Sequence, residues 1–152
     1  MSQALAITPP QEPRKLGWKL LFGLTLQAAL LALLAPADWL LRAKVWVASW
    51  LPWARQLEQA GLGGHADKWL HFGLFALLGG LATHIWWRWA SLRPVMLGLL
   101  ALGVATECLQ HFIPGRGASA ADFAADALGL LAGGVLLWQV QRRARRGGEL
   151  LR

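Results

Sequence analysis

Four long apolar stretches separated by short polar segments dominate the chain. A helix rises about 1.5 Å per residue, so roughly 20 residues cross a hydrocarbon core of about 30 Å. The pattern therefore predicts an all-α integral membrane protein with four transmembrane helices. Within the last of them, Gly129 and Gly133 form a small-xxx-small pair, which favours the close approach of a neighbouring helix. The predicted spans are residues 17–35, 69–87, 94–113 and 120–140.

The segment between the first two spans, residues 36–65, has a different pattern. Its large apolar residues recur at helical spacings, with charged residues between them. Such a stripe is typical of an amphipathic helix that lies in the membrane interface. We therefore expect an interfacial helix at the outer face, with a break or kink at Pro52. The stripe consists of Trp39, Trp46, Trp50, Trp53 and Leu57.

The spans form one membrane domain, residues 17–140, between two short tails. Residues 1–16 hold three prolines and no sustained apolar period, so they are predicted to be a disordered cytoplasmic tail. Residues 141–152 form a basic C-terminal tail. The composition agrees with a membrane protein, because 56% of the 152 residues are hydrophobic and only 15% are charged.

The distribution of positive charge predicts the orientation of the chain. Of the 15 Lys and Arg residues, ten fall on the side of the two termini and five on the other side. Cytoplasmic loops carry the excess of Lys and Arg, so both termini are expected in the cytoplasm. The net charge of +7 comes from residues that flank apolar segments, and a nucleic-acid partner is not expected.

Polar and ionisable side chains gather at the ends of three spans that this orientation places at the outer face. Such groups are costly in hydrocarbon, so a dense cluster predicts a functional site. Glu107 and Asp126 each lie about 10 Å in from a helix end and should share a layer. Ser119 and Asp122 have the spacing of a helix-start capping pair. The candidate ligand-binding residues are Asp67, Lys68, His71, Glu107, Gln110, Arg116, Ser119, Asp122 and Asp126.

Acidic groups outnumber basic ones in this set by four to two. The excess negative charge requires protonation, a charged histidine or a bound cation. Carboxylate and imidazole ligands suit zinc or manganese, although the zinc-protease pattern H-E-x-x-H is absent from the chain. The candidate acid–base residues are Glu107, His71 and Asp122. The candidate metal ligands are His71, Glu107, His111, Asp122 and Asp126.

The order and spacing of these residues resemble the VanZ-like family of membrane proteins, over about residues 20–138. The matching positions are Asp67, Lys68, His71, Phe72, Glu107, Gln110, Pro114, Gly115, Arg116, Ser119, Asp122 and Gly129. Asp126 departs from the family pattern, which usually has Asn there. The family is named for a protein linked to teicoplanin resistance. The resemblance thus implies a bacterial cytoplasmic membrane and a link to glycopeptide tolerance.

Three classes of function fit these residues. The first is a non-enzymatic envelope protein that binds an anionic head group of a lipid-linked wall precursor or a lipoglycopeptide, held by Arg116 and Lys68. The second is an intramembrane enzyme that uses a metal or acid–base groups on an envelope lipid. The third is a proton-coupled transporter, which would need oligomers because four spans leave little room for a pathway. The competing structural interpretation is that the ion pairs only lock helix ends together. Membrane lipids are expected partners. The sequence leaves open whether the chain forms a homo-oligomer.

Overall fold

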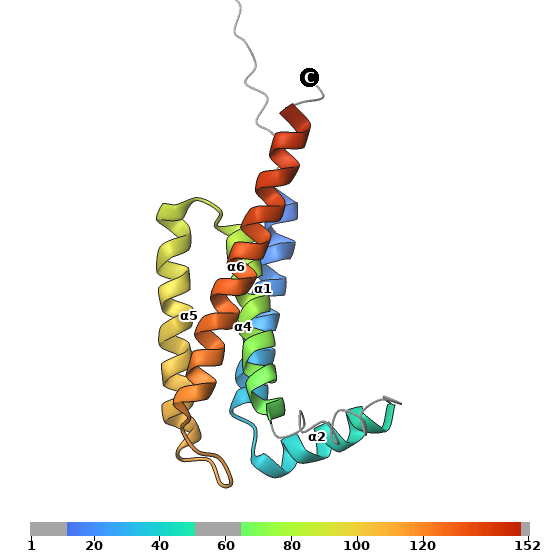
Figure 1. The fold of residues 1–152 in the computed structure, drawn as a ribbon, viewed down its shortest axis with the longest axis vertical. Helices are drawn as coiled ribbons and strands as arrows, with labels where there is room; N and C mark the ends of the chain where they lie inside the picture. Colours follow the sequence, from blue (N-terminus) through green and yellow to red (C-terminus); the bar gives the residue numbers. More distant parts are fainter. Residues whose placement is uncertain (1–11, 51–64, 150–152) are drawn as a thin grey trace, which may run out of the picture.

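The computed structural model describes residues 12–50 and 65–149, and the elements within these ranges are all α-helices. Four of them run side by side, alternately up and down, and form a bundle, whereas α2 leaves the bundle at one end (Figure 1). The predicted all-α class is confirmed for this part of the chain. The helices are α1 (Glu12–Leu33), α2 (Ala37–Trp50), α4 (Ala66–Ile85), α5 (Trp89–Gln110) and α6 (Ala120–Glu149).

Three of the helices are long and apolar enough to cross a membrane. The qualifying stretches are Leu16–Leu33 in α1, Ala90–Gln110 in α5 and Ala120–Arg146 in α6. Large apolar side chains point outward from these helices, and Leu31 is 68% exposed. So much exposed apolar surface is unfavourable in water and normal against lipid tails. The chain is therefore a multi-pass membrane protein.

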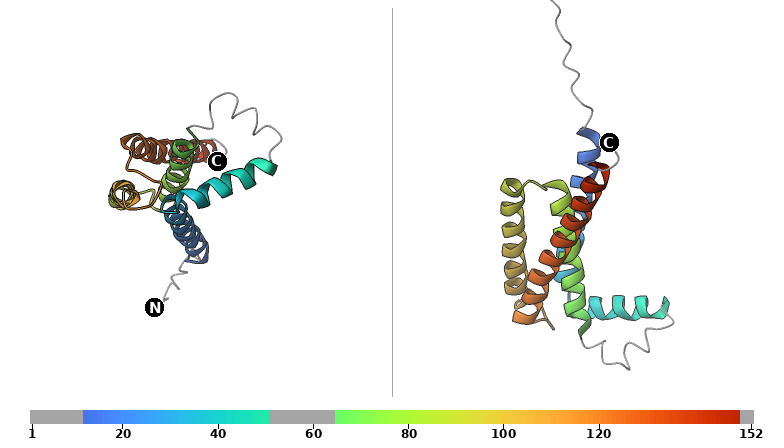
Figure 2. Two further views of the ribbon diagram at one scale, coloured as in Figure 1. Left: turned by 90° about the horizontal axis from the view of Figure 1, so that it is seen from below. Right: turned by 45° about the horizontal axis from the view of Figure 1, so that its top comes forward.

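Helix α4, predicted as the second span at 69–87, is not one of these three. Polar residues, including Lys68, His71 and His84, lie near its two ends. It is instead the centre of the bundle, packed between α1 and α6 (Figure 2). Phe75 and Leu78 of α4 are fully buried. This position explains how polar side chains persist on α4, since neighbouring helices cover them.

Helices α4 and α6 make the closest contact in the bundle, and glycines allow it. A Cβ atom at Gly133 would collide with the Ala76 carbonyl group, and one at Gly129 would collide with the Phe72 carbonyl group. Gly79 on α4 meets the Leu130 carbonyl oxygen in the same way. The predicted close approach at Gly129 and Gly133 is confirmed. It brings the backbones of α4 and α6 together beside their polar residues.

Two helix starts fall earlier than the sequence pattern indicated. Helix α1 begins at Glu12, inside the stretch 1–16 that was expected to be disordered. Helix α5 begins at Trp89, so Pro94 lies inside it instead of at the first position of the predicted span 94–113. As the sixth residue of the helix, Pro94 has no N–H to donate to the Ala90 carbonyl oxygen, so this intrahelical hydrogen bond is missing. The Ser91 hydroxyl also donates to the Arg88 carbonyl oxygen at 3.0 Å, which closes the first turn.

Two helix ends also differ from the predicted spans. Helix α5 ends at Gln110, three residues before the predicted 113, because Pro114 disfavours helical backbone just before it. Helix α6 continues to Glu149, beyond the predicted span end at 140, because its Gln, Arg and Ala residues favour helix after the apolar stretch. Residues 1–11, 51–64 and 150–152, which include the expected break at Pro52, lie outside the described residues.

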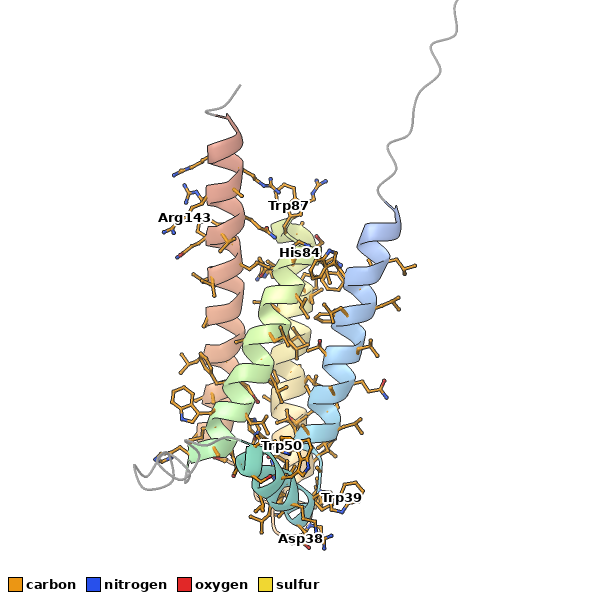
Figure 3. All side chains as sticks on the ribbon, turned by 90° about the vertical axis from the view of Figure 1, so that its right-hand side faces the viewer. Asp38, Trp39, Trp50, His84, Trp87 and Arg143 are labelled. Carbon is orange, nitrogen blue, oxygen red and sulfur yellow. The ribbon has the colours of Figure 1, made fainter. Side chains whose placement is uncertain are left out.

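Helix α2 forms the described part of the predicted interfacial segment 36–65. It runs across the bundle axis at the end where α1 stops and α4 starts (Figure 2). Trp39, Trp46 and Trp50 are 70%, 65% and 72% exposed, and Trp39 and Trp50 are visible on α2 in Figure 3. The helix thus carries a row of indole rings that the bundle does not cover.

Candidate functional site

The candidate site lies at the bundle end where α4 and α6 begin and α5 stops. Three side chains meet there, one from each helix: His71, Glu107 and Asp126. The Nδ1 atom of His71 lies 2.9 Å from Asp126 Oδ1 and 3.7 Å from Glu107 Oε1. His71 and Asp126 are fully buried, and Glu107 is 6% exposed. The predicted common layer of Glu107 and Asp126 is thus confirmed.

The Glu107 carboxylate also fixes the start of α6. The Ser119 backbone N–H donates to Glu107 Oε2 at 2.7 Å, and the Asp122 N–H donates to Ser119 Oγ at 3.2 Å. The predicted capping role of Ser119 is confirmed. In a capping box, the acidic residue three positions after the capping residue accepts the backbone N–H of the capping residue. Here Glu107 of α5 accepts the Ser119 N–H in its place. The α5–α6 turn is therefore fastened directly to the buried cluster.

A second pair of charges lies one helical turn nearer the bundle end. Lys68 Nζ is 3.6 Å from Asp122 Oδ1, with the two side chains 43% and 13% exposed. Lys68 precedes His71 by three residues and Asp122 precedes Asp126 by four, so both pairs join the same faces of α4 and α6. The α4–α6 contact thus has a partly exposed charge pair at the bundle end and a buried pair one turn further in.

Within the part of the chain that the structure describes, several buried polar atoms of the inner layer have no hydrogen-bond partner. They include His71 Nε2, Glu107 Oε1 and Asp126 Oδ2. Gly103 makes room for one of them, because a Cβ at that position would lie 3.1 Å from Asp126 Oδ2. Buried polar groups normally find a partner, and those that do not are candidates for an ion or a functional role. An imidazole between two carboxylates can hold a proton or a cation.

Two residues predicted to belong to the site are placed away from this cluster. The Gln110 amide is 1% exposed and donates to the Leu33 carbonyl oxygen at 2.8 Å, which joins α5 to the end of α1. His111 is exposed in the turn after α5, where its ring packs edge-on against Phe112. Neither side chain is part of the His71, Glu107 and Asp126 group.

The α5–α6 turn carries Arg116 at the same end of the bundle. Arg116 is partly buried, and no ion pair of its side chain occurs among residues 12–50 and 65–149. Gly115 has a φ of 75°, a conformation that favours glycine, and a Cβ there would lie 2.9 Å from the Ala37 side chain. The turn therefore packs against the start of α2. Asp67 lies partly buried in the first turn of α4.

The opposite end of the bundle holds a groove that the sequence pattern did not reveal. It has a volume of about 430 Å³. The ring of His84 packs 4.5 Å from that of Trp18, and the Arg145 guanidinium lies 4.1 Å from the centre of the Trp87 ring. Figure 3 shows His84, Trp87 and Arg143 at this end, far from α2. Only the folding of α4 against α6 brings these residues together. The lining residues are His84, Trp87, Gln141, Ala144 and Arg145.

A second feature missed from the sequence is the polar face of α5 that carries Glu107. Thr106 is 1% exposed, and its hydroxyl donates to the Gly103 carbonyl oxygen at 2.8 Å. Gly103, Thr106 and Glu107 share one face of α5, which a helical spacing of three and four residues from Gly103 would have shown.

Comparison of the chain with protein-family models, with curated proteins and with solved structures finds no match.

Proposed function

We propose that this chain is a VanZ-like protein of the bacterial cell envelope that binds an anionic lipid head group at the outer end of its bundle. The observation that carries the proposal is the placement of two cationic side chains, Lys68 and Arg116, at the bundle end where a membrane-spanning helix begins. Phosphate groups of lipids lie at this level of a bilayer. A lipid-linked wall precursor or a lipoglycopeptide would present such a group.

The proposal includes four spans, with α4 as the fourth. Helix α4 has 20 residues, enough to cross about 30 Å, and it packs against the three helices that are candidate membrane spans. The exposed tryptophans of α2 support an interfacial position, because indole rings favour the membrane boundary. Basic residues on the last part of α6 favour a cytoplasmic location for the opposite end. The site end then faces outward.

Each cation has a distinct part in the proposed head-group site. Arg116 offers a planar guanidinium that binds phosphate through two parallel hydrogen bonds, and the positive end of the α6 helix dipole lies a few residues along the chain. Lys68 is a point charge whose exposed Nζ atom is already held by Asp122. The buried layer beneath is acidic, so an anion is expected to stay at the outer layer.

The test is the affinity of the purified protein for a polyprenyl phosphate in detergent, measured by native mass spectrometry. Arg116→Ala should weaken binding by about tenfold or more, since a charge-assisted bidentate contact is lost. Arg116→Lys should give an intermediate loss, because charge persists without the planar fork. The matched control is Arg143→Ala, which removes an exposed arginine at the other bundle end.

Two results would contradict the head-group proposal. One is equal affinity of the wild type and Arg116→Ala for polyprenyl phosphate. The other is equally tight binding of uncharged polyprenol, because the phosphate would then contribute nothing. The expected link to glycopeptide tolerance is tested separately, by comparing teicoplanin susceptibility of a host that expresses the wild type or Arg116→Ala at equal levels.

A further inference from the structure

The buried cluster of His71, Glu107 and Asp126 has a ligand set that the head-group site does not use. One ligand atom from each residue lies within 4.8 Å of the other two. All three side chains are more than nine-tenths buried, and each has a polar atom with no hydrogen-bond partner among residues 12–50 and 65–149. Three different helices supply them, so the arrangement is created by the packing of the bundle.

The charges of the cluster favour a divalent cation. Two ionised carboxylates beside a neutral imidazole leave two negative charges, and a doubly charged cation cancels both. A protonated imidazole cancels only one, which leaves an excess charge in a buried site or requires a protonated carboxylic acid. The nearby Lys68 is engaged with Asp122 and does not reach into this layer. A divalent cation therefore meets the charge requirement with no further partner.

The distances also fit a small metal ion. Zinc binds imidazole nitrogen and carboxylate oxygen at about 2.0–2.2 Å, so ligand atoms around it are separated by roughly 3.3–3.6 Å. In the cluster, His71 Nδ1 is 2.9 Å from Asp126 Oδ1 and 3.7 Å from Glu107 Oε1. The first contact must lengthen by about 0.5 Å to reach this spacing and the second already lies near it, while one ligand atom from each of the three residues lies within 4.8 Å of the others. The missing side chain of Gly103 leaves space beside the Asp126 carboxylate.

We propose that His71, Glu107 and Asp126 bind one divalent cation of the zinc or manganese class between α4, α5 and α6. Imidazole suits zinc, and carboxylate oxygens suit both zinc and manganese. Three protein ligands leave a fourth position for water or another oxygen ligand. The Ser119 N–H that binds Glu107 Oε2 orients this carboxylate from outside the site. The cation site depends only on the buried cluster and stands whether or not a head group binds.

The test uses the full-length protein in detergent, freed of any affinity tag and treated with a chelator. It is then dialysed against Zn²⁺ or against Mn²⁺, and the bound metal is counted by mass spectrometry. Wild type should retain about one equivalent per chain of at least one of the two metals. Asp126→Asn and Glu107→Gln keep the side-chain shapes and should each lower metal affinity at least tenfold. Asp38→Asn, which removes an exposed carboxylate of α2 outside the cluster, is the matched control and should bind as tightly as wild type.

A second measurement separates metal loss from misfolding. The retained metal should raise the unfolding midpoint of wild type and Asp38→Asn, and it should not change that of Asp126→Asn, because a ligand stabilises only the form that binds it. Failure of folded wild type to retain either metal would overturn the proposal. Equal metal affinity in wild type and Asp126→Asn would overturn it as well. Binding of polyprenyl phosphate is measured separately, in the presence of chelator. Protein that binds polyprenyl phosphate but retains no metal would overturn the cation site and leave the proposed function standing.

Discussion

Substitution of Gly129 by Ala tests how the bundle builds its site. Gly129 lies three residues after Asp126, and a Cβ there would meet the Phe72 backbone, next to His71. The added carbon would lie 3.0 Å from the Phe72 carbonyl carbon and closer still to its oxygen. Because these are backbone atoms, no side-chain rotation relieves the contact. Helices α4 and α6 must therefore move apart.

The magnitude follows from the size of that movement. The closest atom is the Phe72 carbonyl oxygen, and ordinary van der Waals contact begins at 3.4 Å, so the helices must separate locally by about 1 Å. Overpacking of this kind typically costs about 1–3 kcal/mol. The same separation would lengthen the 2.9 Å contact between His71 and Asp126 beyond hydrogen-bond range. The substitution should thus lower both stability and the integrity of the buried cluster.

The matched control is Gly73→Ala, one residue along α4 from Phe72. Nothing lies within 4 Å of a Cβ at Gly73. Both substitutions gain the helix preference of Ala over Gly, about 0.5–1 kcal/mol, so this gain cancels in the comparison. The measurement is the free energy of unfolding in mixed micelles, from sodium dodecyl sulfate titration followed by circular dichroism. Gly129→Ala should be about 1–3 kcal/mol less stable than Gly73→Ala.

Equal stability of the two alanine variants would refute the reasoning, because the α4–α6 contact would then have room for a methyl group. A larger residue sharpens the comparison. Gly129→Leu should prevent folding or give a strongly destabilised protein, whereas Gly73→Leu points into open space and should fold. A folded Gly129→Leu with normal stability would contradict the packing of α4 on α6.

Three further predictions concern the ends of the helices. Ser119→Ala removes the cap of α6 and should destabilise the protein by about 1 kcal/mol in the same titration, and no change would show that the hydroxyl is not needed. Gln110→Leu leaves the Leu33 carbonyl without its partner and should lower the free energy of unfolding by about 1 kcal/mol. Hydrogen exchange at the end of α1 should become faster, and unchanged exchange would argue against this contact. Alkaline phosphatase inserted at residue 116 should be active and one fused after residue 90 inactive, since positive charge favours cytoplasmic termini; the reverse pattern would place the site inside.

The local pattern of the sequence determined the helices and the end of the bundle that carries the polar residues. Apolar runs of span length predicted α1, α5 and α6 as membrane-crossing helices because burial in lipid depends on composition alone. The capping of α6 by Ser119 was predictable because it involves residues three apart. The common depth of Glu107 and Asp126 followed from the rise of a helix, since both residues lie at similar distances along their helices from the α5–α6 turn.

The tertiary structure alone decided which polar side chains meet. The sequence placed nine residues in one candidate site. In the fold, these residues contact different partners, because each partner is set by the helix faces that pack together. Gln110 is directed to the end of α1, whereas His71 and Asp126 form a pair between residues 55 positions apart. Such pairings depend on helix rotation and separation, which the glycines of α4 and α6 set through contacts with the partner backbone. The periodicity of one helix carries no information about the rotation of its neighbour, so the buried cluster appears only when the helices pack.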